Sequence, residues 1–467
     1  MIIMRYIADL HLHSRFSRAV SPRMNPSNLA LWAKKKGIDL VGTGDFTHPF
    51  WFSELRQNLV EIQNQPGFFN FKESIGDTGS QPIFALTVET SHIFSWGGKT
   101  RRIHLLVCAP SFEVAEKLNR ELAKRGNIAS DGRPILGLPC RDFLALALSI
   151  SQDILIIPAH VWTPWFGLYG ANGGGNSIEE IFGDLSSYIY AVETGLSSDP
   201  AMNWRIPELE DRRIVSFSDA HSLEKLGREA TVFDLEELSY ENVREAIMGE
   251  GLGSRFEVLE KNEKNNKLEP KTYNLASNIA YTIEFHPEEG KYHYTGHRNC
   301  EVVQTPEETK LKGTTCPVCK RLLTVGVMHR VEELGKVKSQ SSKVKSQEFD
   351  GLEMVIDESG KHPPYVMTVP LMEILAESLG VATGTQKVAV EYEKLISHFG
   401  SEFNVLLKTS IEEIIPVGGD RISEGIKRVR EGRLVIDPGY DGVFGKVNIW
   451  GEKAEKQGSA TSQQSLF

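Results

Sequence analysis

Short apolar runs alternate with amphipathic segments through residues 1–250 of the chain. IFALTVET, RRIHLLVCA and DILIIPAH are examples of these runs, and each has the length of a buried strand. Segments such as FEVAEKLNRELAKRG and YENVREAIMGEG lie between the runs and end in glycine, as helices commonly do. This alternation predicts an α/β fold with a largely parallel sheet, closed into a barrel or a distorted barrel.

Ionisable side chains stand at or just after the ends of these runs, where the sites of parallel α/β folds gather. His11 and His13 are separated by one residue, so both imidazoles face the same side of a strand. Asp219 and His221 repeat that spacing. Together with Glu89 they form an oxygen and nitrogen set that suits zinc, manganese or iron, and carboxylates can bridge two such ions.

Five further ionisable residues extend this predicted metal centre. Clustered divalent ions about 3.5–4 Å apart activate water and stabilise in-line displacement at phosphorus, so the residues predict hydrolysis of a phosphate ester. Glu193 fits a metal or base contact and a structural hydrogen bond equally well. The other four candidates for second and third ions are Asp45, His48, His104 and His160.

Two pairs of residues in the second half of the chain have the spacing of a structural zinc site. The first pair is His297-x-x-Cys300 and the second is Cys316-x-x-Cys319. His293 or His286 could replace His297 as the fourth ligand. The surrounding segment carries basic side chains, which predict contacts with a duplex backbone or a solvated surface; they include Arg298, Lys320 and Arg321.

Composition and charge refine this picture. A chain of 467 residues predicts two or three domains,. The net charge of −10 argues against a nucleic-acid-binding chain, but residues 291–347 hold 11 Lys and Arg against 5 Asp and Glu, and such a basic segment can bind phosphates. There is no apolar stretch of membrane-spanning length and no unbroken apolar region at the N-terminus, so we expect a cytoplasmic, nucleoid-associated protein without membrane contact.

Changes in composition along the chain predict its division into domains. KNEKNNKLEP (261–270) is turn-rich, GKVKSQSSKVKSQ (335–347) is basic and repetitive, and LMEILAESLG begins a helical pattern. The basic segment fits a disordered insertion or a nucleic-acid arm. The predicted parts are a catalytic barrel at 1–255, a linker at 256–272, a zinc-binding module at 273–334, a disordered basic insertion at 335–348, a helical C-terminal domain at 349–450 and a flexible tail at 451–467.

Five ordered motifs resemble those of the PHP (polymerase and histidinol phosphatase) family. They are ADLHLHS (8–14), GTGDFTH (42–48), the Glu89 run, PAH (158–160) and SDAH (218–221). The resemblance implies a distorted (β/α)7 barrel with up to three metal ions. It leaves open whether Asp45 or His48 is a ligand. The ligands it implies elsewhere are His11, His13, Glu89, His104, His160, Asp219 and His221.

Motifs over nearly the whole chain are similar to those of the endonuclease Q family, and the C-terminal residues 463–467 favour a bacterial member. They include VWTPWFGLYG (161–170), VETGLSSDPAMNWR (192–205), GHRNC with CPVC, and PGYDGVFG. The resemblance implies incision 5′ to a deaminated base (deoxyuridine, hypoxanthine or xanthine) or an abasic site. The phosphate-binding motif of an ATP-driven helicase, G-x-x-x-x-G-K-[ST], is absent from the sequence,.

An aromatic and glycine-rich segment follows His160. A nuclease that acts beside one damaged base must flip it out of the stack, and aromatic faces with small residues suit such a pocket. An aromatic core cluster is the alternative. Ser198 is included in the pocket, although Ser197–Asp199 also fit a helix cap. The other predicted pocket residues are Trp162, Trp165, Phe166, Tyr169, Asn172, Gly173 and Gly174.

The chain ends in Gln-Gln-Ser-Leu-Phe, which resembles the bacterial sliding-clamp-binding pentapeptide. Two adjacent apolar side chains at the end of a polar tail suit docking into a hydrophobic pocket. The predicted clamp contacts are Gln463, Ser465, Leu466 and Phe467.

These observations together predict a metal-dependent, lesion-specific DNA endonuclease. Asp219, His221 and Glu193 would carry the chemistry, with zinc, manganese or magnesium in the barrel and one structural zinc. Double-stranded DNA and a sliding clamp are the predicted partners. The alternatives are another PHP phosphoesterase (a 3′–5′ exonuclease or a small-molecule phosphatase) and a non-catalytic zinc-bearing clamp adaptor.

Overall fold

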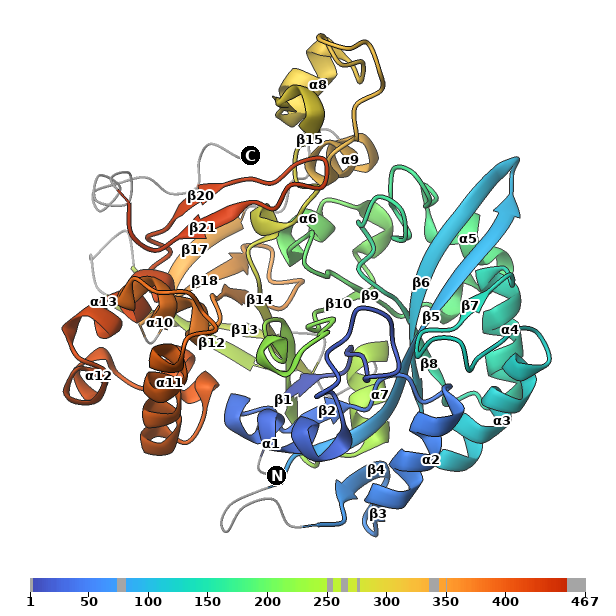
Figure 1. Ribbon diagram of the computed structural model, residues 1–467, viewed down its shortest axis with the longest axis horizontal. Helices are drawn as coiled ribbons and strands as arrows, with labels where there is room; N and C mark the ends of the chain where they lie inside the picture. Colours follow the sequence, from blue (N-terminus) through green and yellow to red (C-terminus); the bar gives the residue numbers. More distant parts are fainter. Residues whose placement is uncertain are drawn as a thin grey trace.

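A mixed β-sheet runs through the protein and joins parts that are far apart in sequence (Figure 1). The computed structural model describes residues 3–73, 81–249, 255–261, 268–274, 278–335, 344–349 and 351–451. Within them the sheet has 13 strands, with β17-β18-β19-β14-β11-β1-β2-β5-β4-β3 as its main path and β6, β7 and β8 attached through β5 and β6. The strands are β1 (Met4–Asp9), β2 (Leu40–Gly42), β3 (Leu59–Ile62), β4 (Gln65–Phe71), β5 (Ile83–Trp96), β6 (Lys99–Ala109), β7 (Ile135–Leu136), β8 (Leu155–Pro158), β11 (Ala230–Leu235), β14 (Ile279–Glu284), β17 (Val344–Phe349), β18 (Leu352–Asp357) and β19 (Tyr365–Met367).

The sheet is mixed, so the prediction of a largely parallel sheet is wrong. Strands β1, β2 and β5 are parallel, but β11 is antiparallel to β1, and β6 is antiparallel to both β5 and β8. For β5 and β6 the difference arises at Gly97 and Gly98, whose positive φ angles of 60° and 75° turn β5 directly back into β6,. The distorted (β/α)7 barrel stays a prediction; the structure establishes a mixed α/β fold.

Helices begin and end where the sequence supplies suitable caps. The side chain of Asn25 accepts a hydrogen bond at the start of α1, and Gly37 ends that helix with a left-handed φ of 85°,. Ser111 and Ser239 cap α3 and α7 in the same way. The helices of the N-terminal half are α1 (Pro26–Lys36), α2 (Pro49–Asn58), α3 (Phe112–Ala123), α4 (Cys140–Ile150), α5 (Ile178–Phe182), α6 (Pro200–Trp204) and α7 (Tyr240–Met248).

Two segments expected to be irregular contain strands. The predicted linker 256–272 overlaps a hairpin of β12 (Arg255–Lys261) and β13 (Leu268–Asn274). The predicted disordered insertion 335–348 includes most of β17, which pairs with β18 at the edge of the large sheet. Residues 336–343 of that insertion lie outside the described residues.

The C-terminal part is not purely helical, because β18 and β19 connect it to β14 and so to the strands of the N-terminal half. A buried ion pair adds a second connection: Nζ of Lys36 on α1 lies 2.8 Å from Oε2 of Glu402. Glu402 also accepts a hydrogen bond from the hydroxyl of Tyr392 at 2.9 Å. The elements after β19 are α10 (Leu371–Leu379), α11 (Gln386–Phe399), a π-helical turn (Asn404–Lys408), α12 (Ile411–Gly418), α13 (Asp420–Arg430), β20 (Val435–Asp437) and β21 (Lys446–Asn448).

The predicted zinc-binding module projects from the top of the molecule in Figure 1. It consists of a small hairpin, β15 (Thr295–His297) and β16 (Val302–Gln304), followed by α8 (Pro306–Lys312) and α9 (Val327–Leu334). The predicted module began at residue 273, but β14 belongs to the large sheet. Among the described helices, no segment has the length and apolarity needed to cross a membrane.

Candidate active site

The structure brings six predicted ligands into two groups that share Glu89. In each group the potential ligand atoms lie within 4.8 Å of one another. Each group is largely buried, as a site that binds ions by protein side chains would be. The first group is His11, His13, Glu89 and Asp219, and the second is Glu89, His104 and His160.

Glu89 lies between the two groups with one carboxylate oxygen toward each. Oε1 is 2.6 Å from Nδ1 of His104 and 2.8 Å from Nε2 of His160. Oε2 is 3.3 Å from Nε2 of His13 and 3.7 Å from Nε2 of His11. A carboxylate placed in this way can bridge two divalent ions.

The strands that carry these ligands differ from the expected arrangement. His11 follows the end of β1, as predicted, but Glu89 and His104 lie within β5 and β6. Glu89 pairs with Leu106, and Ser91 pairs with His104, so Glu89 and His104 are diagonal neighbours on one face of the hairpin. The site therefore forms where a long hairpin passes the ends of β1 and β8.

The backbone is strained at three positions of the site. Asp45, His160 and Asp219 have positive φ angles of 49°, 30° and 45°. Residues with side chains rarely adopt this conformation, and in folded proteins it concentrates at functional sites. At Asp219 it accompanies a backbone hydrogen bond from the amide of His13 to the carbonyl of Ala220, 3.0 Å long.

A second set of side chains orients the ligands. Nδ1 of His11 is 2.9 Å from Oε1 of Glu193, and Nδ1 of His13 is 3.1 Å from Oδ1 of Asp45. Such contacts fix the ring and its tautomer and leave Nε2 for a metal. The predicted catalytic residue Glu193 and the predicted ligand Asp45 thus lie behind the histidines. Neither residue belongs to the two ligand groups found within the described residues.

The donor set fits a divalent metal. Nε2 of His11 is fully buried and has no hydrogen-bond partner among the described residues, which is costly unless the nitrogen binds something. Burial opposes ionisation of Glu89, but the charges of His104, Arg133 and His11 outweigh it and hold the pKa of that carboxyl well below its usual range. For Asp219, burial is likewise outweighed, by a hydrogen bond from His13 and by the charges of nearby histidines, so its pKa is lowered. Glu89 and Asp219 would therefore both be ionised and able to bind a cation.

His221 stands at the mouth of the site, with its side chain 35% exposed. Its Nδ1 is 2.9 Å from the carbonyl of Asp219. Because a carbonyl only accepts, Nδ1 carries the proton and Nε2 is left for substrate or an ion. The structure does not place His221 in either ligand group.

His48 lies apart from the ligands. Nε2 of His48 donates to the carbonyl of Ala129 at 3.2 Å, and its ring stacks on Phe16 with centroids 4.4 Å apart. Of the two alternatives in the second motif, Asp45 is thus the residue that contacts a member of the ligand groups, His13.

Sequence reasoning missed Arg133. Its Nη1 lies 2.9 Å from Oε2 of Glu89, and the charge of Glu89 raises the pKa of the guanidinium. Arg133 lies in a loop after α3 with no periodic pattern. The sequence DGRP offered only a turn signal there,.

Two of the predicted pocket aromatics are core residues. Trp162 and Tyr169 are buried, and their polar atoms are satisfied by Asn203 and Glu208, both at 2.8 Å. The alternative of an aromatic core cluster is therefore correct for this pair. A Trp or Tyr whose polar atom finds an internal partner packs readily in a core.

The other two aromatics are only partly buried. The ring of Phe166 packs beside His104 with centroids 4.5 Å apart, which places it directly at the second ligand group. Trp165 packs edge-on against Tyr292 at 5.0 Å.

The glycines of the predicted pocket serve the packing of their own loop. A Cβ atom at Gly173 would lie 2.2 Å from the carbonyl oxygen of Trp165, and one at Gly174 would lie 2.4 Å from that of Leu168. Asn172 beside them is exposed.

Ser198 is a buried structural residue. Its hydroxyl donates to the carbonyl of Thr194 at 2.9 Å. The predicted helix cap is confirmed at Asp199, which accepts a hydrogen bond from the amide of Met202.

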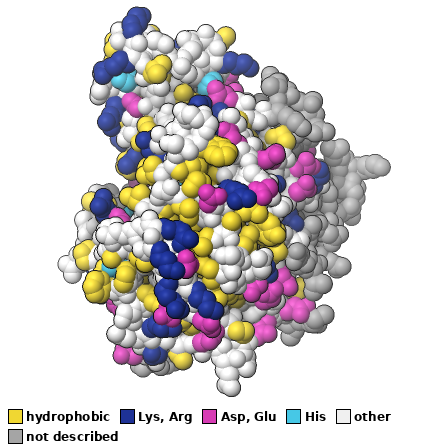
Figure 2. Space-filling view, turned by 90° about the vertical axis from the view of Figure 1, so that its right-hand side faces the viewer, with side chains coloured by type: hydrophobic (Ala, Val, Ile, Leu, Met, Phe, Trp, Pro, Cys, Tyr) yellow, Lys and Arg dark blue, Asp and Glu magenta, His cyan; other side chains and the backbone are white. Residues whose placement is uncertain are grey.

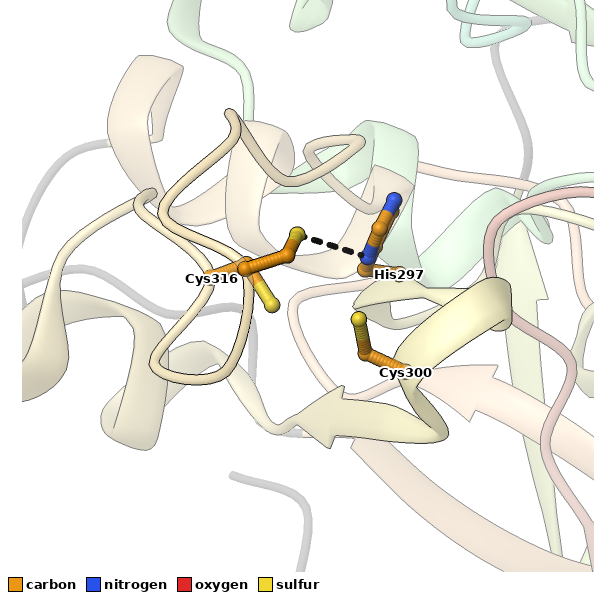
Figure 3. Close-up of side chains that lie close together, drawn as sticks. His297, Cys300 and Cys316 are labelled. Carbon is orange, nitrogen blue, oxygen red and sulfur yellow. Dashed lines mark hydrogen bonds between the residues drawn. The ribbon is translucent and has the colours of Figure 1, made fainter.

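A second candidate metal site lies in the projecting module. His297, Cys300, Cys316 and Cys319 form one group, and Figure 3 shows the side chains of His297, Cys300 and Cys316 close together. Nδ1 of His297 lies 3.5 Å from Sγ of Cys319. Hydrogen bonds from Arg321 lower the pKa of the Cys319 thiol to about 6, which favours the thiolate that binds zinc. His297, rather than His286 or His293, completes this set.

The module has a basic surface. Arg298, Lys320 and Arg321 are exposed, and Figure 2 shows Lys and Arg side chains spread over the module at the top of the molecule. The backbone amide of Arg298 donates to Asp441 at 2.7 Å, which connects the module to the turn before β21. The predicted clamp contacts Gln463, Ser465, Leu466 and Phe467 lie outside the described residues.

Two curated proteins of unassigned function are similar in sequence. YqxK of Bacillus subtilis is 29% identical over 94% of this chain and 98% of its own length. MJ0043 of Methanocaldococcus jannaschii is 31% identical over 63% of this chain, and the match spans 32% of that longer protein. A sequence profile of the MJ0043 C-terminal domain matches residues 370–433, which span α10 to α13.

Two solved structures are similar over nearly the whole chain. One is the lesion-specific endonuclease PfuEndoQ from Pyrococcus furiosus, with 30% identity, a TM-score of 0.75 and coverage of 97% of both chains. The other is an endonuclease Q in complex with a 27-mer duplex carrying an abasic lesion at the active site, with the same identity and TM-score and 97% and 98% coverage. On this similarity the present chain belongs to the endonuclease Q family.

Proposed function

We propose that the protein is a metal-dependent DNA repair endonuclease that hydrolyses the phosphodiester 5′ to a deaminated base or an abasic site. The observation that carries this proposal is the position of Glu89, shared by two buried ligand groups, in a chain of the endonuclease Q family. The relative in complex with abasic duplex DNA supports damaged duplex as the substrate class. The proposal includes a PHP-type barrel as the scaffold of the site.

Divalent ions held by the two groups, zinc or manganese or magnesium, would activate water and offset the charge that develops on the phosphate. One water molecule would give up a proton as its oxygen forms a bond to phosphorus, and the bond from phosphorus to the 3′-oxygen would break. The departing 3′-oxygen gains a proton, so the products are a 3′-hydroxyl and a 5′-phosphate. His221, exposed at the mouth with Nε2 available, is the proposed carrier of that proton.

The base-reading pocket is proposed at Phe166 rather than at the buried Trp162 and Tyr169. Phe166 is partly exposed beside His104, so a flipped base that stacks on it would lie next to the ions. Asn172 is exposed on the following loop and has the donors and acceptor needed to contact a base edge.

The zinc-binding module is proposed to hold the duplex backbone through Arg298, Lys320 and Arg321. Positively charged side chains on an exposed projection can neutralise phosphates without reading sequence. The C-terminal pentapeptide supports recruitment by a bacterial sliding clamp, on sequence resemblance alone.

A 5′-labelled duplex with one deoxyuridine, incubated with the protein and manganese or magnesium, tests this proposal. We expect a single cut immediately 5′ to the deoxyuridine and no cut in a thymine control. A ladder from the 3′ end in both duplexes would instead identify an exonuclease. Absence of cleavage with full metal content would favour the clamp adaptor.

A further inference from the structure

The guanidinium of Arg133 reaches the ligand carboxylate that both metal groups share. We propose that Arg133 binds the scissile phosphate and stabilises the charge that develops on it, an inference that rests on the proposed phosphodiesterase activity. Nη1 of Arg133 lies 2.9 Å from Oε2 of Glu89, and 25% of its side chain is exposed. The group is therefore held inside the site and is still accessible from the mouth, where Asp219 is 23% exposed.

The loop that carries Arg133 is built to approach the metal centre closely. A Cβ atom at Gly132 would lie 2.2 Å from Oδ2 of Asp45 and 2.4 Å from Oγ of Ser17, so only glycine allows this path. The backbone of Gly132 donates to the carbonyl of Phe16 at 3.0 Å. Oδ1 of Asp131 accepts the amide of Arg133 at 3.2 Å. These contacts fix the loop before any substrate binds.

The charges around Glu89 explain why Arg133 would bind a phosphate. Four histidines and Arg133 surround this single carboxylate. Cations held by the two ligand groups would neutralise the negative charge of Glu89, and the guanidinium would then need another anion. The anion that enters this site is the phosphodiester, whose oxygens match the paired donors of arginine.

An alternative role for Arg133 is to hold Glu89 in place for the ions. The two roles predict different effects when Arg133 is substituted. A phosphate-binding arginine contributes to the transition state, so its loss lowers kcat and leaves metal binding intact. A positioning arginine would lower metal occupancy instead.

The test uses the full-length protein with manganese and two nicked duplexes that mimic the product, one with and one without the 5′-phosphate at the nick. We expect the wild-type protein to bind the phosphorylated duplex about tenfold more tightly, as a charge-assisted pair allows. Arg133→Ala should abolish that preference, lower kcat about 100-fold on the damaged duplex and retain the wild-type manganese content. Arg133→Lys should restore part of the preference, because lysine keeps the charge but not the paired donors.

A control for loss of charge near the same loop is Arg18→Ala. The Arg18 side chain is 77% exposed and pairs with Asp131 at 3.3 Å, and exposed pairs of this kind contribute little. We expect this variant to keep the phosphate preference. Reduced manganese content in Arg133→Ala, or an unchanged phosphate preference, would overturn the inference about Arg133. Failure of the wild-type protein to cut damaged duplex would instead refute the proposed function.

Discussion

His11 and Glu193 form a fully buried pair in which Nδ1 of the imidazole lies 2.9 Å from Oε1 of the carboxylate. The other oxygen of Glu193 accepts the backbone amide of His160 at 2.8 Å. One carboxylate thus orients a ligand of each metal group. It does so from behind, because Nε2 of His11 faces Glu89 and Asp219.

Glu193→Gln should weaken metal binding rather than remove the chemistry. Gln cannot supply the charge that favours His11 as a ligand, and loss of such a support commonly lowers metal affinity 10- to 100-fold. Cutting at low manganese should fall accordingly and recover at high manganese. Activity measured across a manganese titration, together with metal content, would show this shift.

Glu208→Gln is a suitable control for Glu193→Gln. Glu208 also accepts hydrogen bonds, from the hydroxyl of Tyr169 and the amide of Ile178, and neither of these partners is a predicted metal ligand. The manganese requirement of this variant should match the wild-type protein. A loss of activity in Glu193→Gln that no manganese concentration restores would contradict an orienting role and favour direct catalysis.

The sequence indicated which residues come together at the candidate site better than it indicated their arrangement. His11, His13, Asp219 and His160 could be found because a fixed spacing or the end of an apolar run marks each of them. The four residues of the Cys/His group in the projecting module are marked by the same kind of local spacing. Local patterns of this kind can be recognised in the sequence without knowledge of how the strands pair.

The predictions that failed concern features that depend on pairing and packing between distant segments of the chain. The long β5–β6 hairpin places Glu89 and His104 within strands, and apolar runs do not reveal strand direction. Whether an aromatic ring faces a pocket or the core depends on partners such as Asn203, which lies 41 residues from Trp162. Arg133 was missed for the same reason, since its partner is Glu89, 44 residues away.

Phe166→Ala should distinguish lesions that have a base from those that have none. If the flipped base stacks on Phe166, removal of the ring costs about 1–3 kcal/mol for a base, or roughly 5- to 150-fold in kcat/KM on deoxyuridine. Cutting at an abasic site, where there is no base to stack, should change much less. The rates of cutting two otherwise identical duplexes, one with deoxyuridine and one with an abasic site, give the ratio between the two lesions.

Trp162→Phe is the matched control for the pocket. Trp162 is buried and its indole nitrogen donates to Asn203, so its replacement should lower Tm and leave the ratio between lesions unchanged. Equal losses on both lesions in Phe166→Ala would mean that Phe166 supports His104 and does not read the base.

Cys316→Ser should release one zinc ion and destabilise the projecting module. Cys316 is the fully buried member of the four-residue group, and a small module closed by zinc depends on it for folding. We expect one zinc ion fewer per chain and weaker binding to undamaged duplex. As the salt concentration rises, the affinity of the wild-type protein for the duplex should fall more steeply than the affinity of the variant. Elemental analysis and a salt titration of binding check both.

Cys108→Ser provides the comparison, since Cys108 is buried in the sheet and burial raises the pKa of its thiol to about 12. This variant should keep its zinc. Retention of all zinc by Cys316→Ser would show that the four residues do not hold an ion.

Stability should fall as the pH rises, because of a buried pair of carboxyl groups. Ala230 pairs with Ile283 across β11 and β14, so Glu229 and Glu284 are neighbours, and both are fully buried. Burial raises the pKa of Glu284 to about 8, although hydrogen bonds from Ser216 and Thr282 oppose this shift.

The direction of this pH dependence follows from the number of protons bound by the folded protein and by the unfolded chain. The ordinary pKa of a glutamate is about 4.3, so between about pH 5 and pH 8 the folded protein keeps a proton that the unfolded chain has lost. The free energy of unfolding therefore decreases as the pH rises through this range. Glu284→Gln mimics the protonated form and still accepts from Ser216, so it should be on the order of 5 kcal/mol more stable than the wild-type protein at pH 9, with a much smaller difference at pH 5. Urea unfolding at pH 5, 7 and 9 measures this difference, and the exposed Glu358→Gln is its control. Parallel stability curves for the wild-type protein and Glu284→Gln would show that Glu284 does not hold the extra proton.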